Sequence, residues 1–280
     1  MSSMLPPLDT RAVSRRTLLR QMLLLSLPVL GAGAAQAQPG ATRTVVGLSS
    51  GLGDTASMLD AREDFAPVVQ LLGDKNTLEV LAIPPTQVAG TIAAGRCDVM
   101  LVLTSDAWRA QNEAGWRVIA LSDDTAGNVV SLHARKGLPA RTPADLKGRK
   151  IAVNGTFARD VLGALLRQSG IEKQVAELRE TRDPQALVYF LQNGFADVAA
   201  TREPDVAAAL EKAGASAFFK TDKIPVYALM ANPKLPQERL ERLRKAVIGQ
   251  RFGAEFQART RIRAFTAVSA DHAVALGLFD

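Results

Sequence analysis

The residues that could bind a ligand are mostly polar side chains that follow directly after short apolar runs. Hydroxyl groups beside the free N–H groups of a helix start suit an anion or another polar head group. A guanidinium in the same place can bind a carboxylate, phosphate or sulfonate through two parallel hydrogen bonds. The candidate ligand-binding residues are Ser49, Ser50, Thr104, Ser105, Trp108, Asn154, Thr156, Arg159, Thr201 and Arg202.

These candidates also have plain structural interpretations. The two serines could simply cap a helix, because a glycine-containing loop and a helical pattern follow them. Trp108, one helical turn into its segment, either stacks on a ligand or packs inside the protein. Arg159 either contacts an anion, lies on a solvated helix face, or pairs with Asp160 or Glu203.

The sequence argues against an enzyme and against a protein built around a metal. It contains no Gly-x-Ser-x-Gly elbow, no Walker loop and no His-Glu-x-x-His pair. The only two histidines, His133 and His272, are expected to be structural or exposed. The single cysteine, Cys97, is predicted to be a small core residue rather than a nucleophile. We therefore expect no catalytic residue, no metal site and no cofactor.

Residues 1–37 have the pattern of a removable export signal. Four arginines precede a short apolar run at 22–30, and Ala35-Gln-Ala37 predicts cleavage after Ala37. Ser14-Arg-Arg-Thr-Leu-Leu-Arg20 resembles a twin-arginine signal, and an ordinary secretory signal is the alternative. The run is too short for a convincing transmembrane helix. The mature protein is thus expected in the periplasm.

Composition places the rest of the chain among globular proteins. Of 280 residues, 47% are apolar, 22% are charged and 5% are aromatic, which suits one large or two modest domains. The whole chain has a formal charge of +6, and removal of residues 1–37 lowers it to +3. This small excess weakens a nucleic-acid interpretation, and the charge-rich segment 237–245 is expected to be a solvated helix face.

The elements that would position the candidates alternate between strands and helices. Strands are predicted at 44–48, 78–83, 99–103 and 116–121, with helices at 55–72, 84–94 and 105–113 between them. A second module with the same alternation begins near residue 129 and includes strands predicted at 150–153 and 176–180. The remainder from 236 to 280 is expected to be mostly helical. Strands separated by helices of this length indicate βαβ units and parallel pairing.

The chain resembles the type II periplasmic solute-binding proteins of ABC transporters, and most closely their phosphate/phosphonate-binding family. The resemblance spans about residues 43 to 250. It rests on these stretches, in order: Thr44-Val-Val-Gly-Leu-Ser49, Phe65-Ala-Pro-Val-Val-Gln-Leu-Leu72, Ala94-Gly-Arg-Cys-Asp98, Thr142-Pro-Ala-Asp-Leu-Lys-Gly-Arg-Lys-Ile-Ala-Val153, Asn193-Gly-Phe-Ala-Asp-Val-Ala199 and Lys223-Ile-Pro225.

The resemblance implies an α/β fold of two lobes, each a mixed or parallel sheet flanked by helices, joined by two crossover strands near 128–132 and 226–230. Lobe 1 would comprise 43–128 plus 230–280, and lobe 2 would comprise 129–229. A small anionic solute would be held between the lobes, at the carboxyl ends of the strands, and delivered to an ABC permease in the inner membrane. The protein would act as a monomer.

One departure from the family concerns the expected anion-binding turn of lobe 2. Phosphonate-binding relatives carry a hydroxyl-rich turn where this chain has Asn154-Gly-Thr-Phe-Ala-Arg159, in which only Thr156 retains a hydroxyl. Arg159 could supply the missing donors. Two other functions stay open on this fold: a ligand sensor or accessory protein of a periplasmic redox enzyme, and an enzyme.

Overall fold

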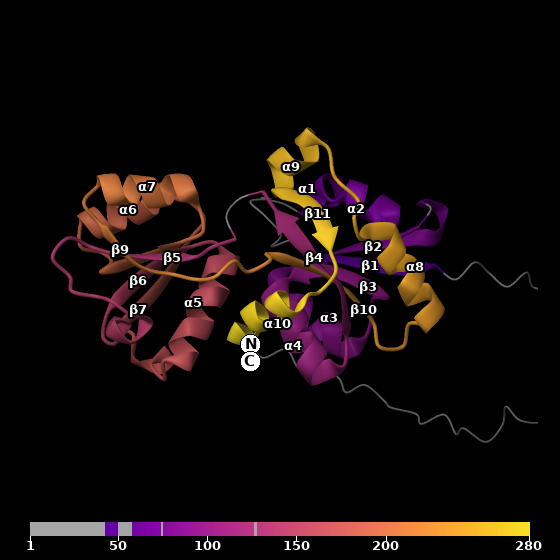
Figure 1. Cartoon of the computed structure of the whole chain (residues 1–280), viewed down its shortest axis with the longest axis horizontal. Coiled ribbons are helices and arrows are strands. Elements are labelled where there is room, and N and C mark those ends of the chain that lie inside the picture. The colour runs from indigo at the N-terminus through magenta and orange to yellow at the C-terminus, as the bar shows by residue number, and fades with distance from the viewer. Residues whose placement is uncertain (1–42, 50–57, 74, 126–127) are drawn as a thin grey trace, which may run out of the picture. The chain divides into compact units, whose positions relative to one another are not determined.

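The computed structural model describes residues 43–49, 58–73, 75–125 and 128–280. The expected export signal, its cleavage site and the candidate residue Ser50 lie outside these ranges. The segment Ala41–Asp280 forms one compact unit that contains two β-sheets (Figure 1). Every described helix is too short or too polar to span a lipid bilayer.

The first sheet has six strands in the order β11-β4-β10-β3-β1-β2. The strand β1 runs parallel to β2 and β3, whereas β10 is antiparallel to both β3 and β4. The strands are β1 (Thr44–Ser49), β2 (Leu78–Ile83), β3 (Val99–Leu103), β4 (Arg117–Asp124), β10 (Tyr227–Ala231) and β11 (Ile262–Thr266). The accompanying helices are α1 (Met58–Asp64), α2 (Ala66–Leu71), α3 (Val88–Ala94), α4 (Thr104–Ala114), α8 (Gln237–Val247), α9 (Ala254–Thr260) and α10 (Ala270–Leu276).

The second sheet has five strands in the order β7-β6-β8-β5-β9. Here β6 is parallel to β7 and β8, and β5 is antiparallel to β8 and β9. The strands are β5 (Ser131–Ala134), β6 (Lys150–Asn154), β7 (Glu177–Thr181), β8 (Val198–Thr201) and β9 (Ser216–Lys220), and the helices are α5 (Thr156–Gln168), α6 (Gln185–Gln192) and α7 (Pro204–Lys212). Two mixed sheets flanked by helices confirm the predicted fold class.

Alternate residues of β6 divide the second sheet into two packed faces. Ile151 and Val153 belong to the large core cluster together with the apolar side of α5, whereas Ala152 packs with α6 and α7 (Figure 1). This is the alternation expected of a strand that is covered on both sides. Because α5 follows β6 after one residue, its first turn lies at the carboxyl end of this strand.

Two connecting segments link the sheets and run beside each other. The chain leaves the first sheet after β4 and returns to it before β10. Between them, the Thr221 N–H donates to the Val130 carbonyl at 3.0 Å, and the Ile224 N–H donates to the Asn128 carbonyl at 2.9 Å. The boundary expected at 229/230 falls inside β10, all of which pairs with β3 in the first sheet.

One sequence prediction about regular elements was wrong, and one strand was missed. The single helix expected at 55–72 is interrupted at Phe65, since Pro67 in the first turn of α2 has no N–H to continue the ladder of α1. The tail after 236 is mostly helical, as predicted, but it also contains β11, which forms an edge strand on β4. Arg263 of β11 reaches Asp123 with a bidentate ion pair, which explains a charge in an otherwise apolar strand.

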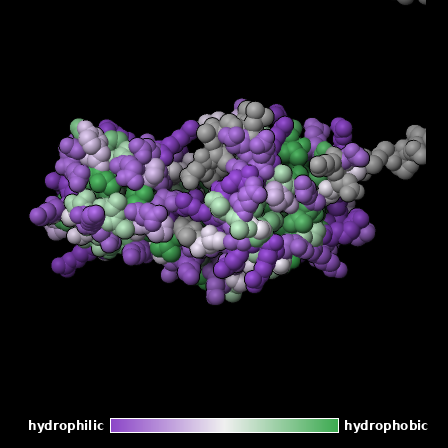
Figure 2. All heavy atoms as spheres, turned by 90° about the horizontal axis from the view of Figure 1, so that it is seen from above, coloured by the Kyte–Doolittle hydropathy of each residue, from purple (hydrophilic) through white to green (hydrophobic). Residues whose placement is uncertain are grey.

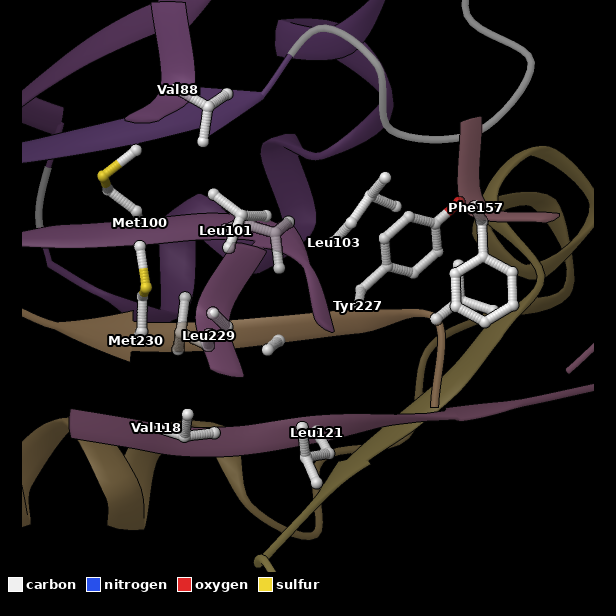
Figure 3. Packing of buried hydrophobic residues seen from close by; sticks show 14 of the residues in the cluster. Val88, Met100, Leu101, Leu103, Val118, Leu121, Phe157, Tyr227, Leu229 and Met230 are labelled. Carbon is white, nitrogen blue, oxygen red and sulfur yellow. The ribbon is translucent and has the colours of Figure 1, made fainter. Parts of the chain in front are cut away.

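The core of the first sheet is centred on β3 and β10, in which every residue is buried. Met100 and Met230 face each other across this strand pair, and Leu101 and Leu229 do the same one step along (Figure 3). The same buried cluster includes Phe157 of α5, whose ring lies at the Tyr227 end in Figure 3. Most of the surface visible in Figure 2 is hydrophilic.

Cys97 lies in this core and is predicted to be unreactive in the folded protein. Its side chain is buried, and burial together with Asp98 raises the pKa of the thiol to about 11. Since the thiolate is the reacting species, we expect an aromatic disulfide reagent at pH 8 to modify native Cys97 about 100-fold more slowly than the urea-unfolded chain. Equal rates would show that the thiol is accessible and ionised.

Candidate functional site

Two helices that begin at strand ends in different sheets bring three of the predicted residues together. Ser105, at the start of α4, donates from Oγ to Asp160 Oδ2 at 2.8 Å. Arg159, in the first turn of α5, donates from Nη2 to Asp160 Oδ1 at 3.0 Å and from Nη1 to Glu180 Oε2 at 2.9 Å. Thr156 Oγ1 donates to Glu180 Oε1 at 3.3 Å. We call these five residues the Asp160 cluster.

Backbone pairing fixes the position of this cluster on the second sheet. Asn154 lies opposite Thr181 in the β6–β7 register, and both its side-chain amide and the N–H of Gly155 donate to the Thr181 carbonyl. Gly155 then adopts φ 78°, a conformation that favours glycine, so the chain can turn directly into α5. Glu180, one residue before Thr181, is consequently held beside the first turn of α5.

Three other candidates, one in the first sheet and two on α4, are buried or hydrogen-bonded within the protein. Ser49 ends β1 and is buried. Thr104 is buried as well, and its Oγ1 donates to the Pro225 carbonyl at 2.6 Å, which ties the start of α4 to the segment before β10. Trp108 Nε1 donates to Asp280 Oδ1 at 2.6 Å. These contacts favour structural roles for Thr104 and Trp108.

The last two candidates belong to a second cluster around Glu203. Thr201 Oγ1 accepts from the Glu203 N–H at 3.0 Å, and Arg202 pairs with Glu203 at 3.5 Å and lies over the Phe157 ring. Arg261, which ends α9 beside the first sheet, also pairs with Glu203. Glu203 therefore forms ion pairs with Arg202 and Arg261. Asp160 and Glu203 were the two partners expected for Arg159, and the structure confirms the pair with Asp160.

A cavity of about 320 Å³ lies beside the Glu203 cluster and is bordered by the segment that leads into β5. Its lining residues are Asn128, Val129, Ser131, Arg202, Glu203, Pro204, Ala207 and Lys220. A second hollow of about 340 Å³ lies between Arg135, Lys136 and the ends of α6 and α7, and contains none of the predicted residues. The first cavity is the one that a ligand bound by Arg202 would enter.

Two carboxyl groups, the half-buried Asp106 and the buried Asp124, lie close to these clusters. Burial, with a further contribution from the neighbouring Asp160, raises the pKa of Asp106 to about 6. Burial likewise raises the pKa of Asp124 to about 6, against hydrogen bonds from the Val226 N–H and Ser122 that lower it. In the described part of the chain, no three His, Cys, Asp or Glu side chains come together as a metal site.

Sequence reasoning missed Glu180 as a member of the site, along with Asp106 and Arg261. Glu180 could have been found, since it closes the strand predicted at 176–180 and parallel strands end at the same edge of a sheet. Asp106 could also have been found, since it directly follows the candidates Thr104 and Ser105 in the sequence. Arg261 gave no local signal, because its partner Glu203 is distant in sequence and belongs to another helix.

Asp106 makes stability depend on pH in a direction that can be measured. Because its pKa is higher in the folded than in the unfolded chain, its contribution becomes unfavourable as pH rises from about 4 to 6 and stays so above that range. We expect Asp106→Asn to raise the melting temperature by about 2–4 °C at pH 8 and to leave it unchanged at pH 4. Glu113→Gln, at the exposed end of the same helix, is the matched control, and an equal gain at both pH values would contradict the assignment.

Comparisons with known proteins agree with this architecture. The structures similar to it include a Xanthomonas citri protein bound to ATP, with 16% identity, coverage of 85% of this chain and 95% of that chain, and a TM-score of 0.62. PhnD1 from Prochlorococcus marinus in complex with methylphosphonate has 16% identity, 85% and 97% coverage and a TM-score of 0.58. A binding protein component of an ABC phosphonate transporter from Pseudomonas aeruginosa has 15% identity, 85% coverage of both chains and a TM-score of 0.56. No protein of curated function matches the chain significantly.

The family model for periplasmic substrate-binding proteins of phosphonate ABC transporters matches residues 55–273. Members of this family are substrate-binding transport proteins rather than enzymes, they are periplasmic, and they work with an ABC permease. The solved structures add the fold, two mixed sheets flanked by helices as in type II periplasmic binding proteins. This chain belongs to the phosphonate-binding family of periplasmic substrate-binding proteins of ABC transporters.

Proposed function

We propose that the chain captures a small anionic solute of the phosphonate or phosphate type and presents it to an ABC permease as a monomer. This proposal rests on the convergence of donors from two helices, each of which follows a strand of a different sheet. Ser105 belongs to α4, and Thr156 and Arg159 belong to α5. The two helix starts add N–H groups and the positive ends of their dipoles. Arg202, beside the neighbouring cavity, is the second cation of the proposed site.

Binding at this site is electrostatic and needs no bond to be made or broken. A hydrogen bond from a guanidinium to an anionic oxygen contributes about 1.5–3 kcal/mol, more than a bond between neutral groups. An anion of phosphonate type offers three oxygens, enough to receive Arg159, Thr156 and N–H groups of a helix start together. The first test is titration calorimetry of the mature protein with methylphosphonate, inorganic phosphate, methanesulfonate and ATP. Absence of binding to all four would contradict the proposal.

Arg159 is predicted to be the most important single donor. Arg159→Ala should weaken methylphosphonate binding by about tenfold or more, equivalent to about 1.4 kcal/mol. Arg167→Ala is the matched control, because Arg167 lies on the same helix, is equally exposed at 42% and also pairs with a carboxylate, Glu172. Calorimetry and melting curves are measured for both variants. Unchanged affinity in Arg159→Ala, or equal losses in both, would assign Arg159 to a surface ion pair.

Export of the protein gives an independent prediction. We propose cleavage after Ala37 and export through the twin-arginine route, so that mass spectrometry of the periplasmic protein finds Gln38 as the first residue. Replacing Arg15 and Arg16 together with lysine keeps the positive charge that an ordinary secretory signal needs. Export of the double variant at the original level would show that the ordinary secretory route is used.

A further inference from the structure

The donors proposed to bind the ligand are already bound to carboxylates of the protein itself. Arg159 Nη1 lies 2.9 Å from Glu180 Oε2, and Thr156 Oγ1 lies 3.3 Å from Glu180 Oε1, so the two oxygens of one carboxylate accept from two proposed ligand donors. The remaining donor contacts of Arg159 go to Asp160, at 3.0 and 3.3 Å. The Asp160 cluster therefore has the arrangement of an anion-binding site in which side chains supply the anion.

Glu180 differs from Asp160 in how firmly it is held. The Asp160 carboxylate accepts from Ser105 as well as from Arg159, and only 19% of its side chain is exposed. The Glu180 carboxylate accepts from the two proposed ligand donors, Thr156 and Arg159, and 32% of its side chain is exposed. A glutamate side chain on a strand end can rotate into solvent without moving the backbone, so Glu180 can give up its place.

The first turn of α5 explains why a carboxylate is favourable there. This turn contains no acidic residue, and Gly155 at the N-cap offers no side-chain acceptor to its N–H groups. The positive end of a helix favours an anion, and Glu180 of the neighbouring strand supplies the negative charge from outside the helix. A ligand anion would satisfy the same groups.

We propose that Glu180 is a built-in competitor of the ligand, whose carboxylate holds Thr156 and Arg159 and must be displaced when an anion binds. This inference rests on the proposed function and adds a residue that sets affinity. Each anion that binds replaces an existing ion pair, so part of its binding free energy is spent on displacing Glu180. Glu180 thereby lowers the affinity for every anion that uses these donors by about the same factor.

The test is titration calorimetry of the mature protein with methylphosphonate and with inorganic phosphate. Glu180→Gln removes the charge that competes for Arg159 Nη1, while the bonds from Arg159 to Asp160 remain, and we expect the affinity for both probes to rise about fivefold. Glu180→Asp keeps the charge on a shorter side chain and should give a smaller rise. Glu177→Gln is the control, since Glu177 lies on the same strand, pairs with Arg179 at 2.7 Å and is 40% exposed. It should leave both affinities unchanged.

The outcomes separate this inference from the function on which it rests. If the wild type binds a probe and Glu180→Gln binds it equally or more weakly, with an intact melting curve, Glu180 is only a cap of α5 and the competitor role is overturned. An equal rise in Glu177→Gln would assign the effect to net charge and would also overturn it. If neither the wild type nor any variant binds either probe, the proposed function fails and the competitor role fails with it. A rise confined to the Glu180 variants supports both.

Discussion

The carboxylate of Asp160 joins the two halves of the proposed site. One of its oxygens accepts from Ser105, in the first turn of α4 beside the first sheet, and the other accepts from Arg159, in the first turn of α5 beside the second. A charged acceptor shared by a hydroxyl and a guanidinium holds both helix starts at hydrogen-bonding distance. Arg159 and Thr156 both donate to Glu180, and the raised pKa of Asp106 follows in part from the charge on Asp160.

A second set of contacts connects the sheets where the chain passes between them. Asp124, at the end of β4, accepts from the Val226 N–H at 3.1 Å and from Ser122 Oγ at 2.9 Å, so both connecting segments meet at one carboxyl group. Arg261 has φ 63°, unusual for a residue with a side chain, and this conformation accompanies its carbonyl accepting from the Thr125 N–H and its guanidinium pairing with Glu203. The strained residue is thus the one that reaches from α9 to the start of α7.

The sequence was sufficient to predict the elements whose signals are local. The strands predicted at 99–103 and 150–153 are β3 and β6, and the order of strands and helices predicted the fold class, which the two mixed sheets confirm. The strand β11 was missed because its burial comes from pairing with β4, and its exposed Arg263 is compensated by Asp123. Long-range pairing of this kind leaves no periodic pattern in the strand itself.

The site was predicted as a list of donors with two alternative acceptors for Arg159, Asp160 and Glu203, and the structure was needed to find Glu180. Donors at strand ends are visible because parallel strands terminate at one edge, which is why Ser105, Thr156 and Arg159 were found. Which carboxylate faces which donor depends on register: Glu180 reaches the first turn of α5 because it lies opposite Val153, one step before the Asn154–Thr181 pair. A shift of one residue would turn the side chain to the other face of the sheet. Glu180 is therefore the group that an anion bound at the proposed site would displace, and the stability of this helix start and the affinity for such a ligand would depend on the same two donors, Thr156 and Arg159.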